Sequence, residues 1–445
     1  MKEFILIAFL IFVFTGNLIA GPAVPSKSVN AVDFGVVADG KTLCGDALQK
    51  AINSITVEGV NSQDGGTVYL PAGIILLDKP IILPAYVMLI GDGASWENTI
   101  TTFHIKHKDG PAFQVFSFCG IKGVGIFYPD NLTDDKMIKP DVYPPAVELW
   151  GCNINLEYIH FDGPWIAVST APNGANAGQC LFKNINGFAH HRGFYMSGGM
   201  DVNRYENIHW FPSRTNSKFE KDRYFYDNLI AFEFGKQDGF MMNACFIIGG
   251  KAFFKQSLYT PKKDEKEISH SLGYSFVNCW IEDVDYGFIF EGISGFSIVG
   301  SNILVKENGV GVKVNSECIA YNGVISGTQI RGYGHDKPFV GVEYDRPYNI
   351  WPPTELNKLS ITDCQIQHGK PAIKLGDTAT RVFIKGNLLS GAKGYPALEI
   401  SEKTDYFTVT DNIFQKINKE QPEPIDNKAG TGSTKIFRDN MFEDL

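Results

Sequence analysis

The 445-residue sequence has no excess of positive charge, no low-complexity tract and, after residue 20, no apolar run long enough to cross a bilayer. Its 40 basic and 49 acidic residues give a net charge of −9. Because it has no basic field to attract phosphate backbones, nucleic acid is excluded as the main partner. Intrinsic disorder is excluded as well, since 44% of the residues are apolar and can fill a core.

The first twenty residues have the pattern of a secretory signal. Lys2 supplies a short basic region, residues 4–14 are apolar, and Ala20 ends a small-residue cleavage site. The alternative is an uncleaved anchor over residues 4–19, which is shorter than the roughly 20 residues of a membrane-spanning helix. We therefore expect residues 1–20 to be removed. Residues 21–445 should then be a secreted protein, extracellular or periplasmic, that is not held to a membrane.

Paired cysteines of the CxxC type are missing from the sequence. The eight cysteines are Cys44, Cys119, Cys152, Cys180, Cys245, Cys279, Cys318 and Cys364. In an exported chain this number suggests disulfides, but three of the cysteines fall at equivalent positions of an internal repeat. Buried free thiols stacked along that repeat are favoured over disulfides.

The repeat is the main positive feature of the sequence. A small or polar residue, then Asn or Cys, then a large apolar residue recur at intervals that mostly lie between 23 and 38 residues. The copies are centred on Asn184, Asn207, Cys245, Cys279, Asn302, Gln365, Asn387, Asn412 and Asn440.

A second motif, a small residue followed by apolar, any and apolar residues, lies between these copies. It begins at Gly193, Ala231, Gly287, Gly311, Gly341, Ala372 and Ala397. Its period of two predicts short strands with one buried face. The outward positions include Glu233, Lys313, Glu343, Lys374 and Glu399. Opposite charges on neighbouring strands should therefore form a surface ladder.

Two short strands per repeat can bury their apolar faces only if the repeats stack on one another. We therefore predict an all-β fold, a single-stranded parallel β-helix over residues 21–445. Phe, Ile and Val should stack inside it, and turn Asn amides should pair along its axis. Helical periodicity is confined to residues 46–54, which should form one short helix. A propeller is the rival fold, but its blades need about 40 residues each, more than the shortest intervals here.

Four segments near the N-terminus are distinctive. They are residues 30–40 (NAVDFGVVADG), 47–52 (ALQKAI), 65–73 (GGTVYLPAG) and 89–93 (LIGDG). Together they resemble the opening of the pectate lyase superfamily of right-handed parallel β-helices, which includes polygalacturonase-like glycosidases and phage tailspikes. The resemblance implies a right-handed coil with a helix-capped N-terminal end and first coils at residues 29–95. Regular coils should follow over residues 150–445.

The catalytic motifs of that superfamily are matched only in part. The sequence has neither the Gly-His-Gly nor the Arg-Ile-Lys of polygalacturonases, which argues against a standard polygalacturonase. Calcium-dependent pectate lyases often carry Trp-Ile-Asp-His, and residues 280–283 (WIED) are similar to it over four residues only. The resemblance therefore implies a fold and does not choose among the reactions.

Long intervals between strands mark candidate loops beside a binding groove. These insertions are residues 129–145, 211–228, 257–271 and 332–355. When the coils are aligned on the Asn or Cys position, Trp210 and Glu282 share a column two coils apart, a separation of about 10 Å. A ring beside carboxylates suits a sugar, because the ring stacks on a pyranose while two carboxyl groups act as acid and as base or nucleophile.

Trp210 is therefore predicted to be a stacking platform, and Glu282, Asp283 and Asp285 are predicted to be catalytic carboxylates. The alternative is that these three acids are ordinary surface residues. Trp165 and Lys306 are further candidates for contact with the substrate.

A second candidate group would suit β-elimination from a uronic acid. That reaction needs a cation to neutralise the carboxylate and a base to remove the adjacent proton. Arg192 is the predicted cation, and His209, His190 or His191 is the predicted base. His191 and Asp201 are also candidates for substrate contact. The alternative is a local ion pair between Arg192 and Asp201.

No metal site is predicted. Adjacent His190 and His191 lack a third ligand with the spacing of a zinc site, and calcium held by acidic side chains is left open.

The leading hypothesis is an exported enzyme that cleaves a polysaccharide by hydrolysis or by β-elimination. Hydrolysis ranks ahead because acids near Trp210 outnumber cations. A non-catalytic glycan-binding or adhesin-like surface protein is the main alternative, and a sugar epimerase is a third. The expected partner is a polysaccharide or oligosaccharide. A homotrimer is also an open expectation, because β-helices of this kind often trimerise.

Overall fold

The computed structural model describes most of the chain from Lys27 to Asp444. The described ranges are 27–56, 64–94, 99–172, 176–211, 223–257, 270–315, 319–320, 322–334, 337–345, 358–377, 379–416, 422–432 and 434–444. The expected secretory signal lies outside the described residues, as do Cys318, most of the insertions at 211–228 and 257–271, and half of the insertion at 332–355.

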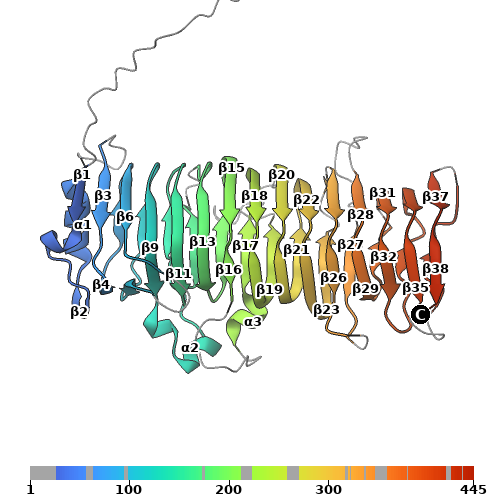
Figure 1. Ribbon diagram of the computed structural model, residues 1–445, viewed down its shortest axis with the longest axis horizontal. Coiled ribbons are helices and arrows are strands. Elements are labelled where there is room, and N and C mark those ends of the chain that lie inside the picture. Colours follow the sequence, from blue (N-terminus) through green and yellow to red (C-terminus); the bar gives the residue numbers. More distant parts are fainter. Residues whose placement is uncertain are drawn as a thin grey trace, which may run out of the picture.

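The described residues form a stack of coils, and the long axis of the stack is horizontal in Figure 1. Successive coils add strands to three sheets, which we number 1, 2 and 3 in the order in which a coil visits them. All pairings between the strands of these sheets are parallel, as the pairs β11–β13, β14–β17 and β21–β23 illustrate. The predicted right-handed parallel β-helix is confirmed.

The bounds of the strands follow sheet by sheet. Sheet 1 contains β1 (Lys27–Asn30), β3 (Gly66–Tyr69), β6 (Val87–Ile90), the first parts of β9 (Gly120–Phe127), β11 (Asn155–Asp162) and β13 (Leu181–Phe188), β15 (Gly199–Glu206), β18 (Gln237–Asn243), β20 (His270–Val277), β22 (Ile293–Val299), β24 (Ile319–Ala320), β25 (Gly323–Ser326), β28 (Leu359–Thr362), β31 (Thr380–Lys385), β34 (Asp405–Thr410) and β37 (Lys435–Arg438). Sheet 2 contains β2 (Asp39–Leu43), β4 (Gly73–Leu77), β7 (Thr101–Ile105), the second parts of β9, β11 and β13, β16 (His209–Trp210), the first parts of β19 (Phe246–Gln256), β21 (Trp280–Phe290) and β23 (Asn302–Val314), β26 (Gln329–Arg331), β29 (Gln365–Gly369), β32 (Leu388–Gly391), β35 (Ile413–Lys416) and β38 (Met441–Asp444). Sheet 3 contains β5 (Ile81–Leu83), β8 (Phe113–Val115), β10 (Val147–Leu149), β12 (Ile166–Thr170), β14 (Arg192–Met196), β17 (Ile230–Phe234), the second parts of β19, β21 and β23, β27 (Val340–Tyr344), β30 (Ile373–Leu375), β33 (Leu398–Ile400) and β36 (Ile425–Asn427).

The turn from sheet 1 to sheet 2 has the same conformation in many coils. Its first residue is left-handed, with φ between 52° and 57° at Asn184, Asn207, Ala244, Asn278, Asp363, Asp411 and Asp439. Asn and Asp tolerate this conformation better than most residues. The next residue points inward and is almost fully buried, as at Ile208, Cys245, Cys279, Ser301, Thr328, Cys364, Asn387 and Asn412. The first sequence motif therefore marks this turn.

Buried amides pair along the axis at the C-terminal end of the stack, as predicted. The Nδ2 of Asn387 donates to the Oδ1 of Asn412 at 2.9 Å, and the Nδ2 of Asn412 donates to the Oδ1 of Asn440 at 3.0 Å. The seven described cysteines are free thiols, and all except Cys152 are buried, which confirms the preference for thiols over disulfides in the described chain.

The core is a ladder of stacked aromatic and aliphatic side chains. Phe194 stacks on Phe232 with ring centroids 5.5 Å apart, and Phe254 meets Phe276 edge-on at 4.8 Å. Outside the core, sheet 3 carries the predicted alternation of charge. Glu343 pairs with Lys313 at 3.3 Å and with Lys374 at 3.2 Å.

Helix α1 (Gly45–Ser54) lies at the N-terminal end of the stack, where Figure 1 shows it in blue. It buries Leu48, Ala51 and Ile52, which share one helical face. A short 3-10 helix, η1 (Ala31–Phe34), precedes it. This agrees with the helix predicted at residues 46–54, whose role is to cover the otherwise open end of the core.

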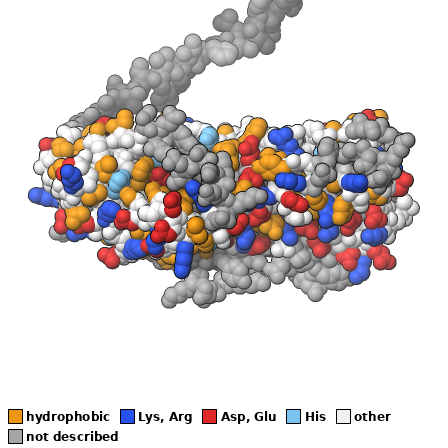
Figure 2. All heavy atoms as spheres, turned by 90° about the horizontal axis from the view of Figure 1, so that it is seen from below, with side chains coloured by type: hydrophobic (Ala, Val, Ile, Leu, Met, Phe, Trp, Pro, Cys, Tyr) orange, Lys and Arg blue, Asp and Glu red, His pale blue; other side chains and the backbone are white. Residues whose placement is uncertain are grey.

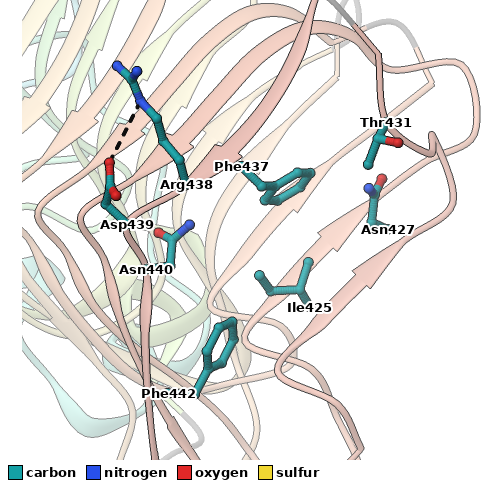
Figure 3. A pocket seen from close by; sticks show the side chains of 8 residues that line it. All are labelled: Ile425, Asn427, Thr431, Phe437, Arg438, Asp439, Asn440 and Phe442. Atoms are coloured by element: carbon teal, nitrogen blue, oxygen red, sulfur yellow. Dashed lines mark ion pairs between the residues drawn. The ribbon is translucent and has the colours of Figure 1, made fainter.

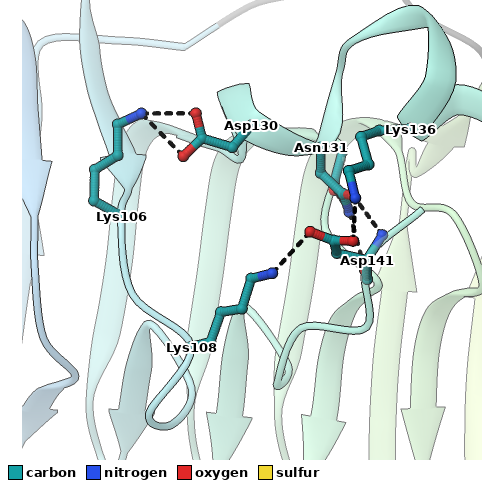
Figure 4. Close-up of polar contacts among 7 residues, drawn as sticks. Lys106, Lys108, Asp130, Asn131, Lys136 and Asp141 are labelled. Atoms are coloured by element: carbon teal, nitrogen blue, oxygen red, sulfur yellow. Dashed lines mark hydrogen bonds and ion pairs between the residues drawn. The ribbon is translucent and has the colours of Figure 1, made fainter.

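Two further helices lie beside the middle of the stack, below it in Figure 1. They are α2 (Asp134–Ile138), which follows the 3-10 helix η2 (Pro129–Asn131), and α3 (Tyr224–Asn228). Both belong to predicted insertions. Ion pairs fix the first insertion to neighbouring coils, from Lys106 to Asp130 at 3.0 Å and from Lys108 to Asp141 at 2.8 Å (Figure 4). Hydrogen bonds from Lys108 and Lys136 lower the pKa of Asp141 to about 2.

None of the helices in the described part of the chain is long and apolar enough to span a bilayer.

Candidate active site at the corner of sheets 2 and 3

The predicted pairing of Trp210 with Glu282 is wrong by one residue. Trp210 is in register with Ile247, which is in register with Ile281, whereas Glu282 follows Ile248. Because side chains alternate between the two faces of a strand, one residue of slip moves Trp210 to the inner face.

Trp210 is fully buried, with its ring 5.9 Å from that of Phe194 and 6.2 Å from that of Phe161. It belongs to the core and cannot stack on a sugar. Among the described residues of the region, Trp280 is an exposed tryptophan, and its indole N–H donates to the Oε1 of Glu282 at 2.5 Å.

The three predicted carboxylates do lie together, where β21 passes from sheet 2 to sheet 3. We call Glu282, Asp283 and Asp285 the acid corner. Asp283 has a left-handed backbone with φ of 56°, and the strand pairing shifts on both sides of Val284. This irregularity re-aims the side chains, as β-bulges do beside many active sites. All three acids are partly exposed.

Aromatic hydroxyl groups surround Asp283. The hydroxyl of Tyr226, on α3, donates to its Oδ2. Burial and the charge of Asp283 raise the pKa of the Tyr333 hydroxyl. Asp283 is therefore positioned between residues from two different insertions.

Asp285 is held by Lys306, whose Nζ lies 3.4 Å from its Oδ1. The same Nζ donates to the carbonyls of Tyr226 at 2.9 Å and of Gly250 at 3.1 Å, and it lies 4.0 Å from the centroid of the Tyr226 ring. Burial raises the pKa of Asp285, although Lys306 acts in the opposite direction. The side chain is nevertheless 39% exposed, so its carboxyl group remains accessible.

The second predicted group forms a cluster on the other side of α3. Arg192 donates from Nε to Glu233, a residue of β17 that is almost completely buried. Its Nη1 donates to the carbonyl of His191 at 2.8 Å and to that of Asn228, in α3, at 3.3 Å. We call Trp165, His191, Arg192, Tyr224 and Glu233 the arginine cluster. The suggested ion pair between Arg192 and Asp201 is wrong, because register pairs β14 with β17 and brings Glu233 to Arg192 instead.

His191 is a stacked and desolvated member of this cluster. Its ring lies on that of Trp165 with centroids 4.4 Å apart, and its Nδ1 is 3.2 Å from the Nη1 of Arg192. Burial, followed by the charges of Arg192 and Lys251, lowers its pKa to about 3. At neutral pH His191 is therefore uncharged and a weak base.

Helix α3 and Lys251 connect the two groups. Tyr224 of α3 packs on Trp165 at 5.3 Å, and Tyr226 of the same helix contacts Asp283. The charge of Lys251 acts on both His191 and Asp285. The structure thus brings most of the predicted residues to one region, and the residues that it gathers are Trp165, His191, Arg192, Glu282, Asp283, Asp285 and Lys306.

Two predicted residues lie apart from this region. His209 is on the outer face of sheet 2 beside Phe246, 5.3 Å between ring centroids, rather than beside Arg192. Asp201 is exposed in β15, where it accepts a hydrogen bond from Gln179 at 2.5 Å. Neither joins the acid corner or the arginine cluster among the contacts of the described chain.

Sequence reasoning missed Glu233, Tyr224, Tyr226, Tyr333 and Lys255. Glu233 was assigned to the surface ladder, and its register with Lys255 fits that assignment, with 3.9 Å between the charged atoms. Its burial follows from the surrounding coils and has no signal in the sequence. The three tyrosines lie in insertions, and only their chemistry could have suggested them.

The described residues contain no group of three or more His, Cys, Asp or Glu side chains arranged to hold a metal ion. A cavity of about 430 Å³ is found elsewhere, on the last coils (Figure 3). Its lining is largely apolar, and its charged residues, Arg438 and Asp439, form a pair at 3.9 Å that is 71% exposed on each side. The acid corner, where partial burial raises the pKa of Asp285, is the better candidate for chemistry.

Comparison with known proteins supports the fold. Residues 28–110 match the family described as "Rhamnogalacturonase A/epimerase, pectate lyase-like". No curated protein matches the sequence.

Solved structures match along most of the chain at low sequence identity. The N-terminal fragment of gene product 12 from bacteriophage phi29 has a TM-score of 0.62 and 11% identity, covering 90% of this chain and 70% of that one. The tailspike of E. coli bacteriophage HK620, solved with a hexasaccharide, has a TM-score of 0.59 and 12% identity, covering 94% and 78%. The A-module of mannuronan C-5 epimerase AlgE4 from Azotobacter vinelandii has a TM-score of 0.51 and 16% identity, covering 89% and 97%. At the level of fold, the chain is a pectate lyase-like right-handed parallel β-helix.

Proposed function

We propose that the protein is a secreted carbohydrate-active enzyme that hydrolyses a polysaccharide at the acid corner. The observation that carries the proposal is the raised pKa of Asp285 beside a second, tyrosine-bound carboxylate. Glycoside hydrolysis requires one carboxyl group that keeps its proton and another that is ionised, and unequal environments separate two such roles.

Each acid has a distinct role in this mechanism. Asp285 donates its proton to the glycosidic oxygen, since burial favours its protonated form. Asp283, oriented by the Tyr226 hydroxyl, acts as base or nucleophile. Lys306 positions Asp285 and restores its charge balance once the proton has left. Glu282 fixes the ring of Trp280 beside the site.

Hydrolysis is favoured over β-elimination by the state of the basic residues. The guanidinium of Arg192 is already paired with Glu233, so it has little charge left for a uronic acid carboxylate. The lowered pKa of His191 makes it a poor base for removing a carbon-bound proton.

The relatives agree with a carbohydrate ligand. The matching family is named for a rhamnogalacturonase and an epimerase, and the HK620 tailspike was solved with a hexasaccharide. Non-catalytic glycan binding is the second candidate function, and an exposed Trp280 would serve it equally well.

The proposal is tested by incubating the protein with a panel of polysaccharides. Hydrolysis should release reducing ends without ultraviolet absorbance, whereas β-elimination would leave an unsaturated sugar that absorbs. Binding without release from any substrate would favour the non-catalytic alternative. We expect activity to survive a chelator, because Glu282, Asp283 and Asp285 already have protein partners. Gel filtration tests whether the protein is the expected homotrimer.

A further inference from the structure

A row of aromatic side chains runs along the outer face of sheet 2. His209, Phe246 and Trp280 occupy the same position of three successive coils, as strand register shows. Each is flanked by buried residues, so the ring points outward. His209 and Phe246 are half-buried, and Trp280 is 45% exposed. We call these three residues the aromatic row.

The row lies where the coil has its shortest connection. One residue separates each left-handed turn residue from the row, as between Asn207 and His209 and between Asn278 and Trp280. No insertion can begin between them, and α2 and α3 both leave the coil at the other end of sheet 2. Within the described part of the chain, no helix therefore arises at the edge of sheet 2 that carries the row.

Amide side chains continue the row in the next three coils. Asn302 is in register with Trp280, and Gln329 and Gln365 follow. The Nδ2 of Asn302 donates to the Oε1 of Gln329 at 3.0 Å, and the Nε2 of Gln329 donates to the Oε1 of Gln365 at 3.3 Å. These amides form a polar strip with the direction and coil spacing of the aromatic row.

The aromatic row and its amide continuation carry no carboxylate, lysine or arginine over six coils. Successive positions are about 4.8 Å apart, close to the length of one sugar unit in an extended chain. Rings offer apolar faces to the C–H face of a pyranose, and amides offer donors and acceptors to its hydroxyl groups. The six positions themselves offer a polyuronate no cation, the nearest being Arg331, two residues after Gln329 on the outer face of β26, whereas an uncharged glycan needs none.

The hydrogen bond from Trp280 to Glu282 makes the row continuous with the acid corner. We propose that the aromatic row and the amides after it bind an extended, uncharged polysaccharide chain parallel to the axis of the β-helix. This inference deepens the proposed function, on which its catalytic meaning rests, by naming the substrate class of the acid corner. The sugar next to Trp280 would be the one delivered toward Asp283.

The experiment measures polysaccharide binding by a variant that is expected not to cleave its substrate. The Asp285→Asn variant, with Trp280→Ala or Phe246→Ala added, is run in native gels containing a soluble β-glucan, xyloglucan, galactomannan, polygalacturonate or alginate. We expect retardation by at least one uncharged polysaccharide and about a tenfold loss of affinity on truncating Trp280. The matched control is Phe383→Ala, which removes a 42% exposed ring from sheet 1.

The outcomes separate the two proposals. Equal binding by the Trp280→Ala and control variants, retardation by polyuronates alone, or no retardation by any uncharged polysaccharide would overturn the inference. Binding that depends on Trp280, together with no cleavage by the wild-type protein, would uphold the inference and refute the proposed hydrolase. Circular dichroism of each variant shows that loss of binding is not loss of fold.

Discussion

The central coils and the C-terminal coils of this β-helix differ in how their buried polar side chains find partners. In the C-terminal coils, Asn387, Asn412 and Asn440 satisfy one another in a ladder of neutral amides. In the central coils, Arg192 and Glu233 form a buried ion pair whose other partners come from neighbouring coils and from α3. The same repeating frame thus carries an internal ladder in one region and a cluster of charges in the other.

The length of the connections accounts for this difference. Where successive coils have short connections, a buried amide such as Asn387 or Asn412 meets its own counterpart one coil away. Where an insertion enters, side chains from outside the frame, such as Tyr226 and Asn228, reach across several coils. Regular coils therefore supply stability, and inserted segments supply the groups that shift pKa values and orient acids. Figure 2 shows acidic and basic side chains interspersed over the side that carries α2 and α3.

The largest expected effect is the loss of activity in the Asp285→Asn variant. An amide cannot donate the proton, so we expect kcat to fall about 10²- to 10⁴-fold in a reducing-end assay. The wild-type rate should also fall as pH rises through the elevated pKa of Asp285, because the acid then loses its proton. The control is Asp377→Asn, on an exposed acid of the C-terminal coils. Retention of more than a tenth of the activity by Asp285→Asn would refute the assignment.

A second difference is expected between two acids of the same column of sheet 3. Glu233→Gln breaks a buried ion pair and leaves Arg192 without its counter-charge, so it should cost about 3 kcal/mol in urea unfolding. Glu399→Gln changes an equivalent outward acid in a C-terminal coil and should cost less than about 0.5 kcal/mol. Similar costs for the two variants would mean that the central coils do not depend on buried charge.

The sequence was sufficient to predict the fold because every coil has short alternating strands that must bury one apolar face. The alternation after Ala231 or Gly287 predicts strands of sheet 3, and the helix predicted at 46–54 matches α1. The register between neighbouring strands of sheet 2 was harder to predict. The repeat can be aligned on Asn207, which is the left-handed turn residue, or on Cys245, which is the inward residue after it. The alternation of Ile208 and Trp210 as inward residues was the signal that could have settled this choice.

The site was only partly predictable for a related reason. Glu282, Asp283 and Asp285 are consecutive or nearly so, and their proximity follows from the sequence alone. The partners of Arg192 depend on which strand lies next to β14 and on where α3 lies. Because the insertions between the coils vary in length, neither can be predicted from the sequence. The same reason explains why Asp201, nearer in sequence than Glu233, was suggested as its partner.

A smaller stability effect is expected in the amide ladder. Asn412→Ala removes the acceptor of the Asn387 backbone N–H and Nδ2 and leaves buried donors unpaired, at a cost of about 2 kcal/mol. The proposed hydrolysis should be unchanged, since the acid corner lies several coils away. Urea unfolding and the reducing-end assay check both parts. Asn243→Ala, at an exposed position of β18, is the matched control and should change neither. A loss of activity in Asn412→Ala without unfolding would show that the two regions are coupled.

The smallest expected effect is a dependence of stability on pH that comes from His190 in the central coils. Its Nε2 bonds to the carbonyl of Asn131 at 3.0 Å, and burial lowers its pKa to about 4. In the unfolded chain this histidine becomes protonated below about pH 6.5, whereas in the folded protein it stays neutral until the pH approaches 4. The free energy of unfolding therefore falls as the pH drops from 6.5 toward 4. Between pH 7 and pH 5.5 this loss should be about 1 kcal/mol, and His190→Gln should remove it. Urea unfolding of both proteins at both pH values measures the difference directly, because any packing cost of the substitution is present at each pH and cancels. His190 contacts Asn131 of η2 and so joins the first insertion to the stack of coils. If the pH dependence of stability is unchanged in His190→Gln, it does not come from this contact.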